Sequence, residues 1–217
     1  HVVTKKGRGF APAEENPTAW HGVGAFDRAG AAVVPPLHPR DWSAAFGEAL
    51  SSAAEENPKV VALTAGMKDG TGLAGFAEKF PSRFYDVGIA EGHMVAFAGG
   101  LAAGGMRPVV AVYSTFLQRA VDQVMHDVAV AGLPVVFAVD RAGIVGADGV
   151  THQGIYDLAM IRAIPNLEIY QPCDEDELKA ALAAALGRNG PSVIRYPRGP
   201  VPPAYGIAAA GAAVQVT

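Results

Sequence analysis

Glu91 stands alone among apolar residues, where the strand-like run YDVGIA ends and the stretch GHMVAFAGGLAAGGM begins. A carboxylate at the N-terminus of a helix gains about 0.3–1 kcal/mol from the helix dipole, so one interpretation is a simple helix cap. The apolar surroundings favour a second interpretation, because a partly buried carboxylate is suited to acid–base chemistry. The residues around Glu91 leave both interpretations open.

Two arginines follow strand-like runs, Arg141 in AVDRAG and Arg198 in RYPRGP. Two guanidinium groups that converge on one end of a sheet can hold a phosphate dianion through paired hydrogen bonds. Isolated arginines in loops are more often solvated or ion-paired, so a phosphate site and a structural role are both open. The intervening loop GIVGADGVTHQG contains four glycines together with Asp148 and His152, a composition typical of ligand-contacting loops.

A glycine-rich segment, GTGLAG at residues 70–75, matches the dinucleotide-binding fingerprint. In that motif the glycines admit a pyrophosphate to the N-terminus of a long helix. Pro81 follows within about two helical turns, so we expect a tight loop and a short helix in preference to a nicotinamide site. The histidines are too widely spaced for a local zinc motif, and we expect no metal ligands from this chain.

The elements that position these residues follow from the hydrophobic pattern after residue 41, which alternates between short apolar runs and longer helical segments. This alternation predicts an α/β fold with a doubly wound, mostly parallel six-stranded sheet and helices on both faces. Asp41 and Asp174, the latter followed by Glu177, are expected to cap helices. The expected strands are 59–65, 83–90, 108–113, 134–140, 167–172 and 192–197, and the expected helices are 41–56, 91–105, 115–131, 154–163 and 174–187.

Ligands of such sheets bind beyond the carboxyl ends of the strands. The residues expected at those ends are richer in polar groups than the rest of the domain. They are Gly66 to Gly75, Glu91, Tyr113 to Phe116, Arg141 to His152, Gln171 to Asp174, and Arg198.

The composition is that of a well-packed globular protein, since 50% of the 217 residues are hydrophobic and 18% are charged. A net charge of −4 and the lack of a basic run give no electrostatic case for nucleic acid or a membrane as a partner. The single cysteine, Cys173, cannot form an internal disulfide and is expected to be a packing residue. We therefore expect a reducing, cytoplasmic compartment.

The two ends of the chain fall outside the alternation of strands and helices. Residues 1–40 begin with what reads as an edge strand, HVVTK, and both ends are rich in Pro, Gly or Ala. We expect residues 1–40 to be the tail of a preceding domain with a linker, 41–200 to be the main domain, and 201–217 to be a linker to a further domain. On this interpretation the chain is a piece of a larger protein.

Four segments resemble the 1-deoxy-D-xylulose-5-phosphate synthase family, whose members are thiamine-diphosphate enzymes of the transketolase superfamily. The segments are DVGIAEGHMVAFAGGLA, VVAVYSTFLQRAVDQVMHDVA, LPVVFAVDRAGIVGADGVTHQG and PSVIRYPRG. HVVTKKGRGFAPAE and WHGVGAFD also look like the end of the first domain and the linker of that family. The resemblance covers about residues 1–200 and implies that residues 41–200 are a pyrimidine-binding domain.

The resemblance implies a role for Glu91 and two aromatic residues in binding the cofactor. Glu91 matches the glutamate that hydrogen-bonds N1′ of the aminopyrimidine and promotes the tautomer that deprotonates C2 of the thiazolium. Phe116 matches the aromatic residue that stacks on the aminopyrimidine, and Tyr113 lines the same site. Gly92 departs from the family, which usually has Gln there, and we expect a minor effect.

The resemblance also implies residues that bind the substrates, pyruvate and D-glyceraldehyde 3-phosphate. Arg141 and Arg198 match the arginines expected to hold the phosphate. Asp148 and His152 match residues near the acceptor aldehyde. Tyr113 is also expected to contact the substrate. His21 matches a linker histidine that reaches toward the pyruvate-derived group and is, with Glu91 and His152, a candidate catalytic residue.

The implied reaction is decarboxylation of pyruvate followed by ligation of the two-carbon unit to glyceraldehyde 3-phosphate. It is the first step of the methylerythritol phosphate route to isoprenoids and also serves thiamine biosynthesis. The family's diphosphate-binding domain, with its magnesium motif, is absent from this chain, so we expect Mg²⁺ and the diphosphate to be bound by that missing domain and residues 1–217 alone to be inactive. The family also implies a homodimer. A non-catalytic binding or assembly module is the alternative.

Overall fold

A computed structural model describes residues 1–17, 19–21, 23, 26–27, 32–33 and 40–202 of the chain. The chain divides into two compact units, His1–Pro39 and Arg40–Thr217. The assignment of residues 1–40 to a preceding domain and its linker stays a prediction. The assignment of residues 201–217 to a second linker stays a prediction as well.

The smaller unit contains a short helix, α1 (Ala11–Glu15), and a two-residue antiparallel pair, β1 (Phe26–Asp27) with β2 (Ala32–Val33). The ring of Trp20 lies edge-on to those of Phe10 and Phe26, with centroids 5.0 Å apart in both pairs. The expected edge strand at residues 1–5 is wrong, because this segment pairs with no strand in the described part of the chain and its valines are exposed.

The larger unit is built on a sheet of six parallel strands in the order β4-β3-β5-β6-β8-β7. The order reverses direction at β3 and β5, as in doubly wound sheets. This arrangement confirms the fold class and the presence of all six expected strands. The strand expected at 83–90 is shorter, because it ends at Asp86 and a loop separates it from Glu91. The strands are β3 (Val60–Thr64), β4 (Phe84–Asp86), β5 (Arg107–Tyr113), β6 (Val136–Asp140), β7 (Glu168–Tyr170) and β8 (Ser192–Arg195).

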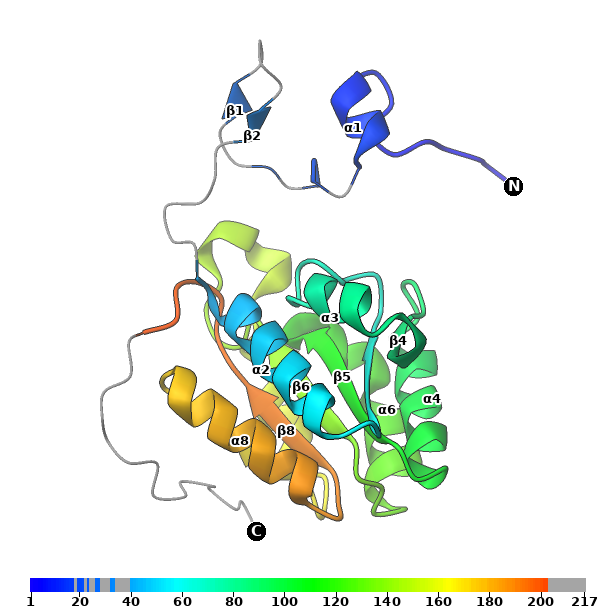
Figure 1. The fold of residues 1–217 in the computed structure, drawn as a ribbon, viewed down its shortest axis with the longest axis vertical. Helices are drawn as coiled ribbons and strands as arrows, with labels where there is room; N and C mark the ends of the chain where they lie inside the picture. Colours follow the sequence, from blue (N-terminus) through cyan, green and yellow to red (C-terminus); the bar gives the residue numbers. More distant parts are fainter. Residues whose placement is uncertain (18, 22, 24–25, 28–31, 34–39, 203–217) are drawn as a thin grey trace. The chain divides into compact units, whose positions relative to one another are not determined.

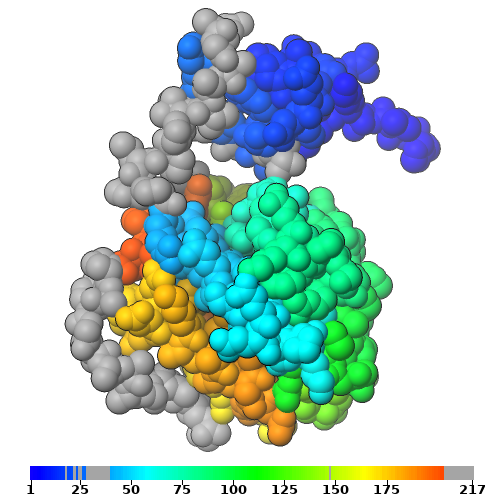
Figure 2. Space-filling model, viewed as in Figure 1, coloured from blue at the N-terminus to red at the C-terminus, as the bar shows by residue number. Residues whose placement is uncertain are grey.

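Apolar side chains cover both faces of this sheet, because successive residues of a strand point to opposite faces. On one face they pack against α2 (Trp42–Glu56), α3 (Ala74–Lys79) and α8 (Glu175–Gly187). On the other they pack against α4 (Glu91–Ala103), the segment 114–129 and α7 (Asp157–Ile161). Figure 1 shows α2 and α8 side by side in front of the sheet, with α4 and α6 on its far side. Figure 2 shows α2 and α8 forming part of the outer surface of the first face.

The two predicted caps are present. The Asp41 carboxylate accepts a hydrogen bond from the Ala44 amide at 2.8 Å at the start of α2. Asp174 accepts from the Glu177 amide at 2.9 Å at the start of α8. The return bond of a capping box is displaced by one residue, since the Glu177 carboxylate accepts from the Cys173 amide.

Two expected helices differ from the structure. The region expected as one helix at 115–131 is a series of short segments: α5 (Ser114–Leu117), a 3-10 turn (Gln118–Ala120), α6 (Val121–Gln123) and a π-helix (Val124–Ala129). The helix expected at 154–163 is shorter and begins only at Asp157. The reason is that the backbone of Gly154 forms two hydrogen bonds with Gly143, which close the loop before α7 and cannot serve a helix.

Three 3-10 turns complete the larger unit: η1 (Pro81–Arg83), η4 (Gly146–Asp148) and η5 (Val150–His152). The last two lie in the loop after β6, the loop that carries Asp148 and His152. Of the helices in the described residues, none has the length and apolar character required to cross a bilayer.

Candidate active site

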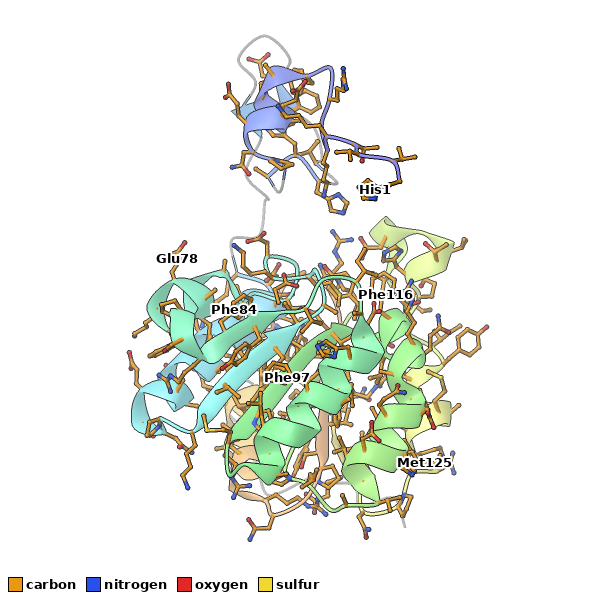
Figure 3. The ribbon with its side chains drawn as sticks, turned by 90° about the vertical axis from the view of Figure 1, so that its right-hand side faces the viewer. His1, Glu78, Phe84, Phe97, Phe116 and Met125 are labelled. Atoms are coloured by element: carbon orange, nitrogen blue, oxygen red, sulfur yellow. The ribbon has the colours of Figure 1, made fainter. Side chains whose placement is uncertain are left out.

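The candidate site lies at the carboxyl ends of β5, β6 and β8. Tyr113 and Asp140 end β5 and β6, and Arg198 follows β8 by three residues. Phe116 is in α5, directly after β5, and Figure 3 shows it near one end of the larger unit, with Met125 of the π-helix toward the opposite end.

Glu91 is the first residue of α4, and its side chain is only 3% exposed. Its Oε1 accepts a hydrogen bond from Arg119 Nη1 at 2.6 Å. Arg119 is half exposed, so the ion pair connects a buried carboxylate with a side chain that reaches solvent. The carboxylate of Glu91 thus bonds to a side chain 28 residues away, which argues against the simple-cap interpretation.

Arg119 was missed by the sequence reasoning. The signal that could have found it is its spacing, because it lies three residues after Phe116 in a segment expected to be helical, where such residues are neighbours. Its guanidinium carbon lies 4.8 Å from the centroid of the Phe116 ring. One arginine therefore contacts both Glu91 and Phe116.

Aromatic rings form the middle of the site. Tyr113 and Phe116 are stacked, with centroids 5.7 Å apart and an interplanar angle of 16°. The ring of His152 stands edge-on to Phe116 at 5.3 Å, and His152 Nδ1 is 2.8 Å from the hydroxyl of Thr151. Burial raises the pKa of the Tyr113 phenol, so it remains a neutral hydrogen-bonding group near pH 7.

Arg141 has the most extensively fixed side chain of the site. It stacks on Tyr113, with its guanidinium carbon 3.9 Å from the ring centroid, and it is only 12% exposed. Its Nη1 donates to the Gly70 carbonyl at 2.5 Å and to Ser43 Oγ at 3.2 Å, and lies 3.0 Å from Asp140 Oδ2. Its Nε is buried without a hydrogen-bond partner in the described part of the chain.

The Asp140 carboxylate is fully buried behind Arg141. Burial raises its pKa to about 6, although Arg141 and the hydroxyl of Ser43 both favour the ionised form. At pH 7 the group is therefore ionised and accepts the short hydrogen bond from Ser43 Oγ at 2.6 Å.

Asp148 links the two predicted phosphate-binding arginines. Its Oδ1 accepts from Arg198 Nη1, and its Oδ2 lies 3.7 Å from Arg141 Nε. A carboxylate of the chain thus stands between two guanidinium groups, a position in which a phosphate oxygen would also be favoured.

The GTGLAG segment is a packing loop in this fold. The helix that follows it, α3, has six residues, as the short distance to Pro81 predicts. A Cβ on Gly70 would overlap the Tyr113 hydroxyl, and one on Gly72, which has φ +73°, would overlap the carbonyl of Ser43. The glycines therefore permit close contact with Tyr113 and α2.

The contacts form one continuous series in the larger unit. It includes seven residues predicted from the sequence and the unpredicted Arg119. In order along the series they are Glu91, Arg119, Phe116 (with His152), Tyr113, Arg141, Asp148 and Arg198. His21 belongs to the smaller unit, so its place at the site remains a prediction. No cluster of three or more His, Cys, Asp or Glu suited to a metal ion occurs among the residues that the structure describes.

The larger unit is thus a doubly wound α/β domain whose candidate site lies at the carboxyl ends of its parallel strands. A family model described as "Transketolase, pyrimidine binding domain" matches residues 38–203, and the chain belongs to this family.

Among its relatives are proteins named 1-deoxy-D-xylulose-5-phosphate synthase. The protein from Desulfotalea psychrophila is 53% identical over 199 residues, which are 92% of this chain and 31% of that protein. The synthase 1 of Geobacter sulfurreducens is 56% identical over 200 residues, with the same shares. The protein from Aquifex aeolicus is 52% identical over 211 residues, 97% of this chain and 33% of that protein. The chain spans about a third of the length of these relatives.

Solved structures share the fold. A chain described as "Split gene transketolase, inactive beta4 tetramer" is 34% identical with a TM-score of 0.67, and the match covers 76% of this chain and 53% of that one. A transketolase from Leishmania mexicana has a TM-score of 0.69 over 88% of this chain and 30% of that one; at 24% identity it supports the fold alone.

Proposed function

We propose that this chain supplies the pyrimidine-binding side of a thiamine-diphosphate enzyme that forms 1-deoxy-D-xylulose 5-phosphate from pyruvate and D-glyceraldehyde 3-phosphate. The observation that carries the proposal is the continuous series of contacts from Glu91 to Arg198. It provides a buried carboxylate, stacked aromatic rings and two arginines in one place, and relatives at 52–56% identity bear the name of this synthase.

The residues present fit an aminopyrimidine ring. Thiamine diphosphate, when bound, supplies a thiazolium carbon that can add to a 2-oxo acid and accept the electrons released by decarboxylation. Glu91 is proposed to hydrogen-bond N1′ and to share a proton there, for which its low exposure is suitable. Phe116 is proposed to offer its face to the ring, and Tyr113 to line the same site.

The arginine end of the series fits a phosphorylated acceptor. The buried Arg141 Nε has a hydrogen to donate and no partner in the described part of the chain, and a phosphate oxygen would satisfy it. Arg198 is proposed to bind the same phosphate. Asp148 and His152 are proposed to contact the acceptor aldehyde, and His21 is proposed to approach the pyruvate-derived group.

The other groups that the reaction requires are proposed to belong to a different domain. We place the diphosphate and Mg²⁺ on a diphosphate-binding domain that is not in this chain, with 41–200 as the pyrimidine-binding domain, 1–40 as the tail of a preceding domain and linker, and 201–217 as a linker. The complete enzyme is proposed to be a cytoplasmic homodimer that begins the methylerythritol phosphate pathway to isoprenoids.

The test compares Glu91 variants in the complete protein, in which this chain is joined to the diphosphate-binding domain. Glu91→Gln keeps the size of the side chain and removes its charge, and we expect product formation to fall by about 10²-fold or more, as for typical acid–base groups. Glu78→Gln is the matched control, because Glu78 is exposed on α3 (Figure 3). Product from the parent and the control, but not from Glu91→Gln, supports the proposal.

The alternative is a non-catalytic module. The 34% identical chain described as an inactive tetramer of a split-gene transketolase agrees with this alternative and equally with one part of an active enzyme. A complete protein that binds thiamine diphosphate but forms no product from the two substrates would move the conclusion to this alternative.

A further inference from the structure

We propose that Ser43 and Asp140 are positioning residues for Arg141, which hold the Nη1 corner of its guanidinium so that Nε remains available to an acceptor phosphate. This inference rests on the proposed function, in which Arg141 binds that phosphate. It assigns a role to two residues to which the proposed function gives no contact with cofactor or substrate.

Three acceptors surround Nη1, and they come from different parts of the chain. Gly70 offers a carbonyl from the loop after β3, Ser43 a hydroxyl from the first turn of α2, and Asp140 a carboxylate from the end of β6. Ser43 Oγ also donates to Asp140 Oδ2 at 2.6 Å, so the hydroxyl is itself held in place. Convergence of a loop, a helix and a strand on one nitrogen fixes the guanidinium in a single orientation.

Asp140 also holds the backbone of Arg141. Its Oδ1 accepts from the Arg141 amide at 2.7 Å, while Oδ2 faces Nη1. The φ of Arg141 is +58°, in the left-handed region that residues with a Cβ rarely adopt. One buried carboxylate thus stabilises an unfavourable backbone conformation and the side chain that it directs.

The same arrangement leaves Nε unsatisfied. This donor is buried, and Asp148 Oδ2 is 3.7 Å away, which is too far for a hydrogen bond. A buried donor without an acceptor is unfavourable, so the site gains from an oxyanion that approaches Nε. The three acceptors around Nη1 keep the guanidinium in the orientation that leaves Nε without an acceptor. If they were weakened, the guanidinium could rotate and Nε could donate to another group of the protein.

The test uses Asp140→Asn, Ser43→Ala and Arg141→Ala in the complete protein, with Asp176→Asn on the exposed side of α8 as the control. The kinetic readout compares glyceraldehyde 3-phosphate with glyceraldehyde, which lacks the phosphate. Loss of a hydrogen bond to a charged group corresponds to about 10-fold or more in affinity. We expect Asp140→Asn and Ser43→Ala to raise KM for the phosphorylated acceptor by that factor, with kcat within about 3-fold, and to leave kcat/KM for glyceraldehyde unchanged.

A second readout does not depend on turnover. Binding of inorganic phosphate to the protein without its cofactor is measured by calorimetry, and we expect the dissociation constant to rise in all three variants but not in Asp176→Asn.

If Arg141→Ala weakens phosphate binding while the Ser43 and Asp140 variants do not, the positioning role is wrong and the proposed function stands. If Arg141→Ala leaves the dissociation constant for phosphate unchanged, Arg141 is not a phosphate-binding residue. Both the positioning role and the role of Arg141 in the proposed function are then wrong. If Asp140→Asn does not fold, Ser43→Ala decides, and normal phosphate binding by that variant overturns the inference.

Discussion

Arg119 connects the two residues proposed to hold the aminopyrimidine ring, because its guanidinium contacts the Glu91 carboxylate and the face of Phe116. A carboxylate as buried as Glu91 is costly without a partner of opposite charge. Arg119 provides that partner at 2.6 Å, and a ring that hydrogen-bonds Glu91 must bind beside this ion pair.

We expect Arg119→Ala to lower the free energy of unfolding by about 1–2 kcal/mol, because the substitution leaves the buried Glu91 carboxylate without its hydrogen bond. The loss is no larger because the Arg119 side chain is itself half exposed. Denaturant unfolding of this chain measures the change, and Arg162→Ala, at an exposed position of the same larger unit, is the control. In a Glu91→Gln background the loss should be smaller. Equal losses in the two backgrounds would show that the pair is not coupled.

Asp140 makes stability depend on pH with a defined sign. Its pKa is about 6 in the folded chain, against an ordinary value of 3.8, so the folded state binds the proton more tightly than the unfolded state. The contribution of this group to the free energy of unfolding is therefore fully present below about pH 4 and lost as the pH rises through about 6. Relative to Asp140→Asn, the parent should gain about 1 kcal/mol in unfolding free energy between pH 7 and pH 5. A difference that stays constant, or falls, over this range would contradict the assignment.

Helix boundaries differ in how far they follow from local sequence. The starts of α2 and α8 could be predicted, because a capping aspartate satisfies amides within its own first turn. The start of α7 could not, because it depends on the bridge between Gly143 and Gly154, which the fold brings together. The division of 114–129 has no Pro or Gly to signal it and appears only in the structure.

Two glycines close together in the chain should respond to the same substitution in opposite directions. Gly72→Ala should destabilise by at least about 1–2 kcal/mol, since Gly72 has a left-handed backbone and its Cβ would meet the Ser43 carbonyl. Gly75→Ala should be neutral or stabilise by up to about 1 kcal/mol, because Gly75 lies in α3 and a Cβ there meets nothing within 4 Å. Thermal unfolding of the two variants checks the signs, and a stable Gly72→Ala would disprove the packing role of this loop.

At the scale of the whole molecule, the candidate site is assembled at one edge of a sheet by residues far apart in the sequence. Its outline could be predicted, because parallel strands have all their carboxyl ends at the same edge, and polar residues there stand out against apolar strands. Its supporting contacts could not, because the bond from Ser43 to Asp140 joins positions 97 residues apart and depends on how α2 lies on the sheet.

A chain that covers about a third of its relatives' length should not complete the proposed reaction alone. We expect no product from residues 1–217 with pyruvate, glyceraldehyde 3-phosphate, thiamine diphosphate and Mg²⁺, and product when the diphosphate-binding domain of a synthase is supplied. Light scattering of the assembled protein should give the mass of a homodimer. Turnover by the isolated chain would overturn the assignment of the missing groups to another domain.

The π-helix at Val124–Ala129 bears on how many residues the chain needs between the site and the core. Its turns are wider than those of an α-helix, and the Val130 amide donates to the Met125 carbonyl five residues back. Phe116 and Arg119 lie before it, at the site, while Val128 within it packs into the core. A wider turn of this kind holds one residue more than an α-helical turn. Removing one residue there would restore α-helical spacing and leave the segment that carries Phe116 and the segment that carries Val128 in nearly the same relative orientation. Chains that keep this site should therefore tolerate one residue fewer within 124–129, whereas a deletion in a regular α-helix such as α4 would rotate the residues that follow by about 100°.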